Sequence, residues 1–195
     1  MFTAIIAVCS LLSVPTVIPF TMQTFGVFLS IGALGGKKGT IAVLTYILLG
    51  LCGAPVFSGF GGGIGHLFGS TGGYIFGFLF SAVVMWITEP FCSKSKLLSI
   101  ASMVLGNVVC YIVGTFWFML VYSANTGEIG LFSALLVCVF PYIIPDALKI
   151  ALAFVISNRI KLNLMSMFLM LLTQKKKLIG WVFYMLMGVF DLQVR

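Results

Sequence analysis

Charge is scarce in this sequence. Its 195 residues include 11 Lys and Arg and 4 Asp and Glu, so charged residues make up 8% of the chain while hydrophobic residues make up 61%. A soluble domain carries roughly 25% charged residues, because water must solvate its surface. A fold made from this chain must therefore turn most of its outer surface toward lipid, which excludes an ordinary soluble protein.

Residues that carry out catalysis are equally few. His66 is the one histidine and lies in a glycine-rich stretch, where a lone histidine is more often a packing residue than a metal ligand. The sequence contains no H-E-x-x-H, no G-x-S-x-G and no paired carboxylates. We therefore expect no enzyme activity, no bound metal and no cofactor.

Nucleotide and nucleic-acid motifs are also absent. The glycine run at residues 61–66 departs from G-x-G-x-x-G at its last position, and no G-x-x-x-x-G-K-[ST] occurs. Uphill transport would thus take its energy from a partner or an ion gradient. The net charge of +7 comes from small basic clusters between apolar runs, with no basic face interleaved with aromatics, so we expect no nucleic-acid partner. The five cysteines contain no C-x-x-C pair and are interpreted as small apolar residues of helices.

Long apolar runs predict an all-α integral membrane protein with a bundle of about six transmembrane helices, since each crossing needs roughly 17–25 apolar residues. The expected spans are residues 2–18, 22–36, 39–56, 72–88, 97–122 and one within 130–160. Pro141 and Pro145 divide the last stretch, because proline removes a backbone donor and disfavours helix just before it. We expect an interfacial piece over 130–140 and a spanning helix that starts with Pro145.

Basic residues predict the orientation. With six spans, three basic pairs fall on one side of the membrane: Lys37 and Lys38, Lys94 and Lys96, Arg159 and Lys161. The opposite loops, 19–21, 57–71 and 123–129, contain no Lys or Arg. By the positive-inside rule both termini are expected to be cytoplasmic and the 57–71 loop external.

The C-terminal part of the sequence differs in its pattern from the six expected spans. We expect a membrane domain over residues 1–162 with a ligand pocket at its outer side, and an apolar, basic extension over 163–195 of unknown role. The apolar stretches 164–173 and 178–190 are short for a span and flank three lysines, a pattern typical of interfacial segments beside anionic membrane lipid.

Two features stand out from a plain apolar bundle. Nine of the 22 glycines fall between Gly53 and Gly73, which fits an inward-folded lid, and equally a flexible outer loop with small-residue helix packing at Gly73 and Gly77. Asp146 and Lys149 lie three residues apart on one helix face, in a span with no other charge before its cytoplasmic end. Buried charges in a membrane pair with each other or face a polar cavity, so either a structural ion pair or the polar end of a ligand cavity is possible.

Three segments in order resemble one known family. Residues 17–25 read Val-Ile-Pro-Phe-Thr-Met-Gln-Thr-Phe, the glycine run at 61–65 is followed by Gly-Ser-Thr-Gly-Gly-Tyr at 69–74, and Ile-Pro-Asp-Ala-Leu-Lys occupies 144–149. Over residues 15–160 the chain resembles the BioY family, the biotin-specific substrate-capture (S) components of energy-coupling factor (ECF) transporters.

The resemblance implies high-affinity biotin binding and uptake in a prokaryotic plasma membrane, with an ECF coupling subunit and cytoplasmic ATPase subunits as partners. The residues expected to bind substrate are Asp146, Lys149, Gln23, Tyr74, Gly62, Gly63 and Thr71. Two alternatives stay open at this point: an S component or small permease for another water-soluble vitamin, and a membrane assembly protein in which Asp146 and Lys149 merely pair.

Overall fold

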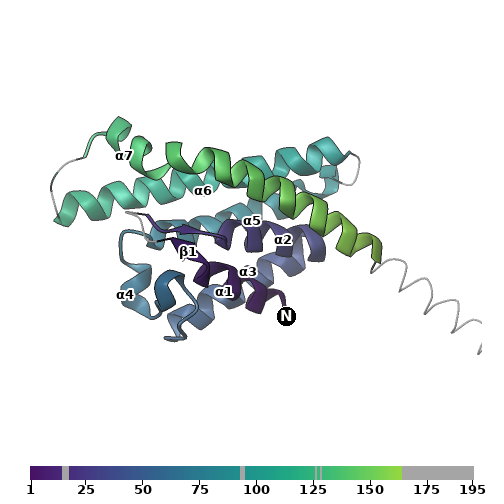
Figure 1. The fold of residues 1–195 in the computed structure, drawn as a ribbon, viewed down its shortest axis with the longest axis horizontal. Coiled ribbons are helices and arrows are strands. Elements are labelled where there is room, and N and C mark those ends of the chain that lie inside the picture. The colour runs from purple at the N-terminus through teal and green to yellow at the C-terminus, as the bar shows by residue number, and fades with distance from the viewer. Residues whose placement is uncertain (15–17, 93–94, 126, 128, 164–195) are drawn as a thin grey trace, which may run out of the picture. The chain divides into compact units, whose positions relative to one another are not determined.

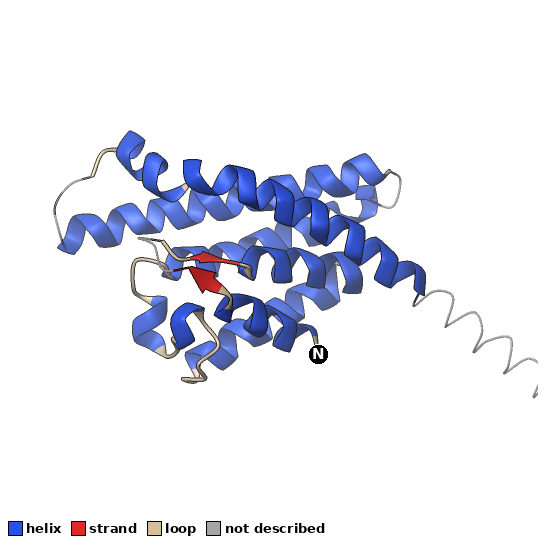
Figure 2. Cartoon of the chain, viewed as in Figure 1, coloured by secondary structure: helices blue, strands red, loops and turns tan. Residues whose placement is uncertain are grey.

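Almost every described element is a helix (Figures 1 and 2). The computed structural model describes residues 1–14, 18–92, 95–125, 127 and 129–163. The elements in chain order are α1 (Phe2–Leu11), β1 (Ser13–Val14), β2 (Phe20–Thr21), α2 (Gln23–Leu34), α3 (Gly36–Leu51), η1 (Ser58–Phe60), α4 (Ile64–Leu67), α5 (Gly72–Cys92), α6 (Lys96–Asn125), α7 (Leu131–Cys138) and η2 (Phe140–Tyr142). Residues 143–163 are also helical.

The chain divides into two units, Met1–Asn158 and Arg159–Arg195. All the labelled elements belong to the first unit, together with the helix from residue 143 to its boundary. In the second unit residues 159–163 are helical. The two interfacial segments expected at 164–173 and 178–190 lie outside the described residues.

The first expected span is wrong in length. A helix was expected over residues 2–18, but α1 ends at Leu11, and Ser13–Val14 pairs antiparallel with Phe20–Thr21. Proline explains the early end, because Pro15 and Pro19 each disfavour helix at the residue before them. The chain therefore enters α2 from a short extended segment, which places backbone carbonyls next to that helix.

Small residues hold α5 against α6. A Cβ at Gly73 would lie 2.1 Å from the Cβ of Trp117, and one at Gly77 would lie 3.0 Å from the Sγ of Cys110. Glycine at these positions lets the two backbones approach closely, as membrane helices commonly do. The packing interpretation of Gly73 and Gly77 is thus confirmed.

The last expected span is confirmed as a separate helix, but it begins earlier than expected. Val139 has φ −125° and ψ −56°, which ends α7, and η2 then leads into the helix that starts at residue 143. Pro145 is therefore the third helical residue and not the first. Its missing N–H still costs no intrahelical bond, because the first four N–H groups of a helix have no partner within it.

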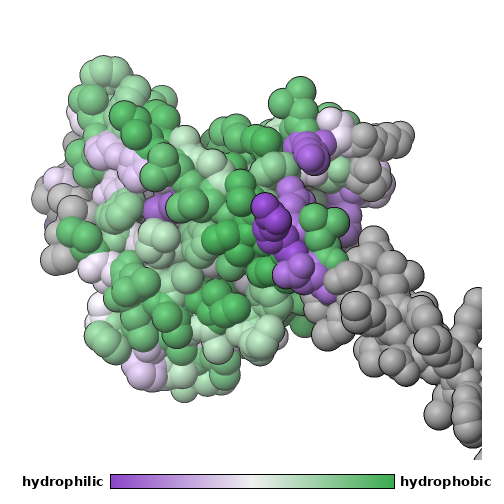
Figure 3. Space-filling view, turned by 45° about the vertical axis from the view of Figure 1, so that its right-hand side comes forward, coloured by the Kyte–Doolittle hydropathy of each residue, from purple (hydrophilic) through white to green (hydrophobic). Residues whose placement is uncertain are grey.

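The surface of the first unit is that of a multi-pass membrane protein. Among the described residues, three helical stretches are long and apolar enough to cross a bilayer: Gly72–Cys92, Lys96–Asn125 and Leu131–Asn163. Large apolar side chains stand exposed along them, with Phe116 65% and Ile112 64% exposed. Figure 3 shows such a face, mainly apolar with hydrophilic residues scattered on it. Lipid must cover a surface of this kind.

The described basic residues Lys37, Lys38 and Lys96 share one end of the bundle. The α2–α3 junction, which precedes Lys37 and Lys38, lies against the C-terminal part of α5, since a Cβ at Gly36 would lie 2.5 Å from Trp86 and 2.8 Å from a carboxylate oxygen of Glu89. The α5–α6 junction therefore lies at the same end as these lysines.

Candidate functional site

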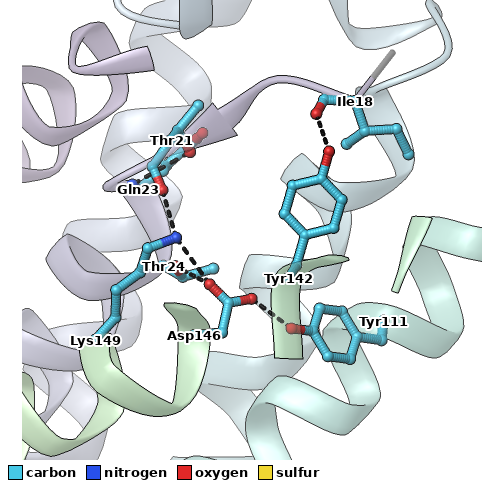
Figure 4. Close-up of polar contacts among 8 residues, drawn as sticks. All are labelled: Ile18, Thr21, Gln23, Thr24, Tyr111, Tyr142, Asp146 and Lys149. Carbon is cyan, nitrogen blue, oxygen red and sulfur yellow. Dashed lines mark hydrogen bonds and ion pairs between the residues drawn. The ribbon is translucent and has the colours of Figure 1, made fainter. Parts of the chain in front are cut away.

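A buried ion pair forms the centre of the site (Figure 4). The Nζ atom of Lys149 lies 2.8 Å from Oδ1 of Asp146, and the two residues are 4% and 3% exposed. Both come from the first turns of the helix that starts at residue 143. An ion pair this deep needs further hydrogen bonds to offset the loss of water around it.

Three donors converge on Asp146. Lys149 and Thr24 both donate to Oδ1, the second at 3.3 Å, and the Tyr111 hydroxyl donates to Oδ2. A carboxylate has about four acceptor positions, so one position remains. The carboxylate is held from three helices: α2, α6 and the one that carries it.

Lys149 is held almost as completely. Its ammonium donates to Asp146 and, at 2.7 Å, to the backbone carbonyl of Thr21. The same nitrogen lies 4.0 Å from the centre of the Phe20 ring, a cation–π contact. An ammonium has three N–H donors, so one of them is left without an oxygen partner from these contacts.

The segment that leads into α2 forms one wall. Its position is set by the last helix and η2: Lys149 binds the carbonyl of Thr21, and the Tyr142 hydroxyl donates to the carbonyl of Ile18 (Figure 4). The Phe20 ring also stacks with the ring of Tyr142 at 6.3 Å between centres.

These residues surround a cavity of about 60 Å³. Its walls are formed by the 18–24 segment, α5, α6 and the last helix; the lining includes Ile18, Thr21, Gln23, Thr24, Thr71, Tyr74, Ile75, Phe78, Tyr111, Tyr142, Asp146 and Lys149. Sites for small molecules usually enclose roughly 300–1,000 Å³. A ligand of that class therefore enters only when the walls move apart.

Five of the seven expected site residues line this one cavity: Asp146, Lys149, Gln23, Tyr74 and Thr71. Gln23, 5% exposed, begins α2, and its Nε2 donates to the Tyr46 hydroxyl at 2.7 Å. The Tyr74 hydroxyl donates to the carbonyl of Cys138 at 3.3 Å. The sequence places these residues far apart, and the helix packing brings them together.

Gly62 and Gly63 are not among the residues that line the cavity. A Cβ at Gly62 would lie 2.4 Å from the carbonyl oxygen of Ala54, and Gly63 has φ +83° and donates its N–H to the carbonyl of Gly50 at 2.7 Å. Gly63 thus holds the loop to α3, and Gly62 packs on the residues that follow α3. Within the glycine-rich loop, Ser58 and Thr71 reach the cavity.

Sequence reasoning missed three polar groups of the site. Thr24 belongs to the motif that carried the family resemblance, and its position next to Gln23 was the available signal. Tyr142 follows Pro141, but nothing in its spacing relates it to residue 18. Tyr111 is a tyrosine within a long apolar helix, where tyrosine is unremarkable, so only the packing reveals its bond to Asp146.

A larger hollow of about 910 Å³ lies between α6 and the segments α7 and 143–155, and Tyr111 lines both it and the polar cavity. Its walls are almost wholly apolar, with Asn107, Tyr111 and Thr115 as the polar exceptions. None of the described residues that line it is charged. A hollow of this character is suited to lipid chains, so the charged cavity is the candidate for a polar ligand.

Together the fold and the site define a class: a multi-pass membrane protein with a small cavity that is built around a buried ion pair and can take a polar ligand. The BioY family model matches residues 1–166, and the chain belongs to the BioY family. It is 40% identical over 161 residues to the biotin transporter BioY of Thermotoga maritima, covering 82% of this chain and 91% of that protein. It is 35% identical over 146 residues to the probable biotin transporter BioY of Pyrococcus horikoshii, covering 75% and 82%.

A solved structure is similar as well. The S-component for biotin from an ECF-type ABC transporter matches with a TM-score of 0.71 and 28% identity, over 82% of this chain and 86% of that one. The family and a mostly helical membrane fold, as expected from the sequence, are thereby confirmed.

Proposed function

We propose that this chain binds biotin in the Asp146–Lys149 cavity and serves as the substrate-binding S component of an ECF-type transporter in the cell membrane. The similar proteins are named for biotin transport. In this role the chain is a transporter subunit and not an enzyme. The energy for uptake comes from ATPase subunits through a coupling subunit, which agrees with the lack of a nucleotide loop in the chain.

The observation that carries the proposal is the hydrogen-bonding capacity left at the ion pair. Asp146 keeps one acceptor position, and Lys149 keeps one N–H donor. A ureido ring carries a carbonyl directly beside an N–H, so it matches a donor placed directly beside an acceptor. Biotin contains such a ring, and the apolar walls at Ile75 and Phe78 suit its hydrocarbon parts.

Buried polar groups also supply selectivity. A ligand without the ureido N–H or carbonyl would leave the remaining acceptor position of Asp146 or the remaining N–H of Lys149 without a partner in a buried site, and a site of this kind rejects such analogues strongly.

The direct test is equilibrium binding of radiolabelled biotin to the purified protein in lipid nanodiscs. We expect submicromolar affinity, and competition by unlabelled biotin but not by other water-soluble vitamins. Absence of binding at submicromolar biotin would overturn the proposal. Stronger competition by a different vitamin would move the chain to an S component for that ligand.

We further propose that both termini are cytoplasmic and that the cavity opens to the outside. The support is the basic residues, of which Lys37 and Lys38 lie at the same end of the bundle as the α5–α6 junction. The test is labelling in whole cells of a cysteine-free variant that carries one new cysteine. Gly65→Cys should react with an impermeant maleimide, and Lys38→Cys should react only after the membrane is permeabilised; the reverse pattern inverts the orientation.

A further inference from the structure

We propose that Tyr46 is a positioning residue that fixes which end of the Gln23 amide faces the cavity, and so makes that position an acceptor for a ligand N–H group. The proposal rests on the proposed biotin-binding function and adds to it a residue that does not line the cavity.

Hydrogen-bond polarity carries the first step. Tyr46 is fully buried, and its hydroxyl donates to the backbone carbonyl of Val56 at 3.1 Å. A carbonyl only accepts, so this bond uses the single proton of the hydroxyl. Gln23, 2.7 Å away, must then donate to the hydroxyl through Nε2. The two ends of a glutamine amide have nearly the same shape, and neighbours decide its orientation. Oε1 is the end left for the cavity.

Packing fixes Tyr46 itself. The Phe57 ring meets it edge-on, with 5.5 Å between centres and an interplanar angle of 81°. Phe57 is fully buried, and it fills the space beside Gly50, where a Cβ would lie 2.0 Å from the ring. The Ser10 hydroxyl lies within hydrogen-bond distance of the same Val56 carbonyl and of the Ala7 carbonyl. Neither the ring nor the acceptor of Tyr46 is therefore free to move.

The consequence is a three-point pattern in the cavity. Asp146 presents an acceptor, Lys149 a donor and Gln23 a second acceptor, and all three side chains line the same space (Figure 4). A ureido group presents N–H, carbonyl and N–H in a row, which is the complementary order. A ligand with a carbonyl or carboxylate in place of the second N–H would face Oε1 without a proton between the oxygens, and such a mismatch is selected against.

The test is a double-mutant cycle on biotin affinity with Tyr46→Phe and Gln23→Leu in lipid nanodiscs. Tyr46→Phe should weaken binding roughly tenfold, the worth of one hydrogen bond. In the Gln23→Leu background the same change should have no further effect, because the amide it orients is gone. Tyr122→Phe removes a ring hydroxyl outside the cavity and serves as the matched control, with unchanged affinity. Equal losses from Tyr46→Phe in both backgrounds would overturn the positioning role.

Wild-type protein that fails to bind biotin would overturn the proposed function, whereas equal losses with intact wild-type binding overturn only the role of Tyr46.

A second experiment changes the ligand and needs only one protein variant. Two biotin analogues each carry a methyl group on one of the two ureido nitrogens. One of these analogues should bind the wild type at least tenfold more weakly than biotin does. In Gln23→Leu the same analogue should bind as tightly as biotin. Unchanged penalties for both analogues would overturn the acceptor role of Gln23 even if Tyr46→Phe does not fold.

Discussion

Lys149 donates at once to the Asp146 carboxylate and to the backbone carbonyl of Thr21, at 2.8 and 2.7 Å. The ammonium therefore joins the last helix to the segment before α2, and the ion pair is part of the cavity wall as well as of its chemistry. Because both side chains are buried, each depends on the other for an opposite charge. A single substitution therefore leaves one buried charge without its counter-charge, whereas a double substitution removes both charges.

Asp146→Asn and Lys149→Ala should each weaken biotin binding roughly tenfold to a hundredfold, since hydrogen bonds to charged groups contribute about 1.5–3 kcal/mol. Lys96→Ala is the control, because it removes an exposed charge at the start of α6. Equilibrium binding of labelled biotin measures the effect. Losses of the same size at Lys96 would contradict the assignment of roles at the ion pair.

The variants of the ion pair should rank differently in melting temperature than in biotin affinity. Lys149→Ala leaves the Asp146 charge buried with only Thr24 and Tyr111 as partners, and breaking such a pair costs about 3–5 kcal/mol. The double variant Asp146→Ala/Lys149→Ala removes both charges and should melt at a higher temperature than Lys149→Ala, while it still fails to bind biotin. A double variant that binds normally would favour the interpretation of a purely structural pair.

Tyr142→Phe should change the rates of binding more than the affinity. The lost hydroxyl no longer holds the carbonyl of Ile18, so the wall over residues 18–21 opens more readily. Since the cavity of about 60 Å³ must widen to admit a ligand, both association and dissociation should become faster. Stopped-flow measurement with a fluorescent biotin derivative checks this, and dissociation unchanged from wild type would show that this wall does not limit exchange.

The helices that form the site were predictable because their causes are local. Apolar runs and prolines in the sequence predict α5, α6 and the break near Pro141, and the structure confirms each of them. The expected length of α1 was wrong because it gave no weight to Pro15 and Pro19, and because a two-residue ladder between Ser13–Val14 and Phe20–Thr21 is too short to leave a periodic pattern. The start of the last helix was wrong by two residues, because a proline is tolerated throughout a first turn.

The ion pair at the centre of the site was predictable because charged residues are scarce in this chain. Asp146 and Lys149 stand out in an apolar span because burying either alone is costly. Tyr111 and Tyr46 do not stand out, since their partners lie on other elements: Asp146 for the first, and Gln23 and Val56 for the second. Such contacts follow from helix packing, which a single sequence does not specify.

Gly114→Ala should impair binding through Tyr74. A Cβ at Gly114 would lie 2.4 Å from the Tyr74 ring, so the ring must shift from its place in the cavity wall. We expect a loss of biotin affinity of tenfold or more, measured by equilibrium binding. Gly130→Ala is the matched control, since nothing lies within 4 Å of a Cβ there; equal affinities for the two variants would remove Tyr74 from the site.

The loop over residues 57–71 should make stability depend on pH through His66. Burial lowers the pKa of this imidazole below its usual value of 6.5, since its Nε2 is buried without a hydrogen-bond partner in the described structure and its ring stacks on Phe57 at 5.4 Å. The folded state therefore favours neutral histidine, and below pH 6.5 the unfolded chain binds more protons. The contribution of His66 to stability is thus fully present above pH 6.5 and falls as the pH is lowered toward the folded-state pKa.

Melting temperatures between pH 7.5 and 5 should decrease for the wild type and stay nearly level for His66→Phe, which keeps the ring contact without the charge. A decrease of the same size in His66→Phe would assign the pH dependence to another group.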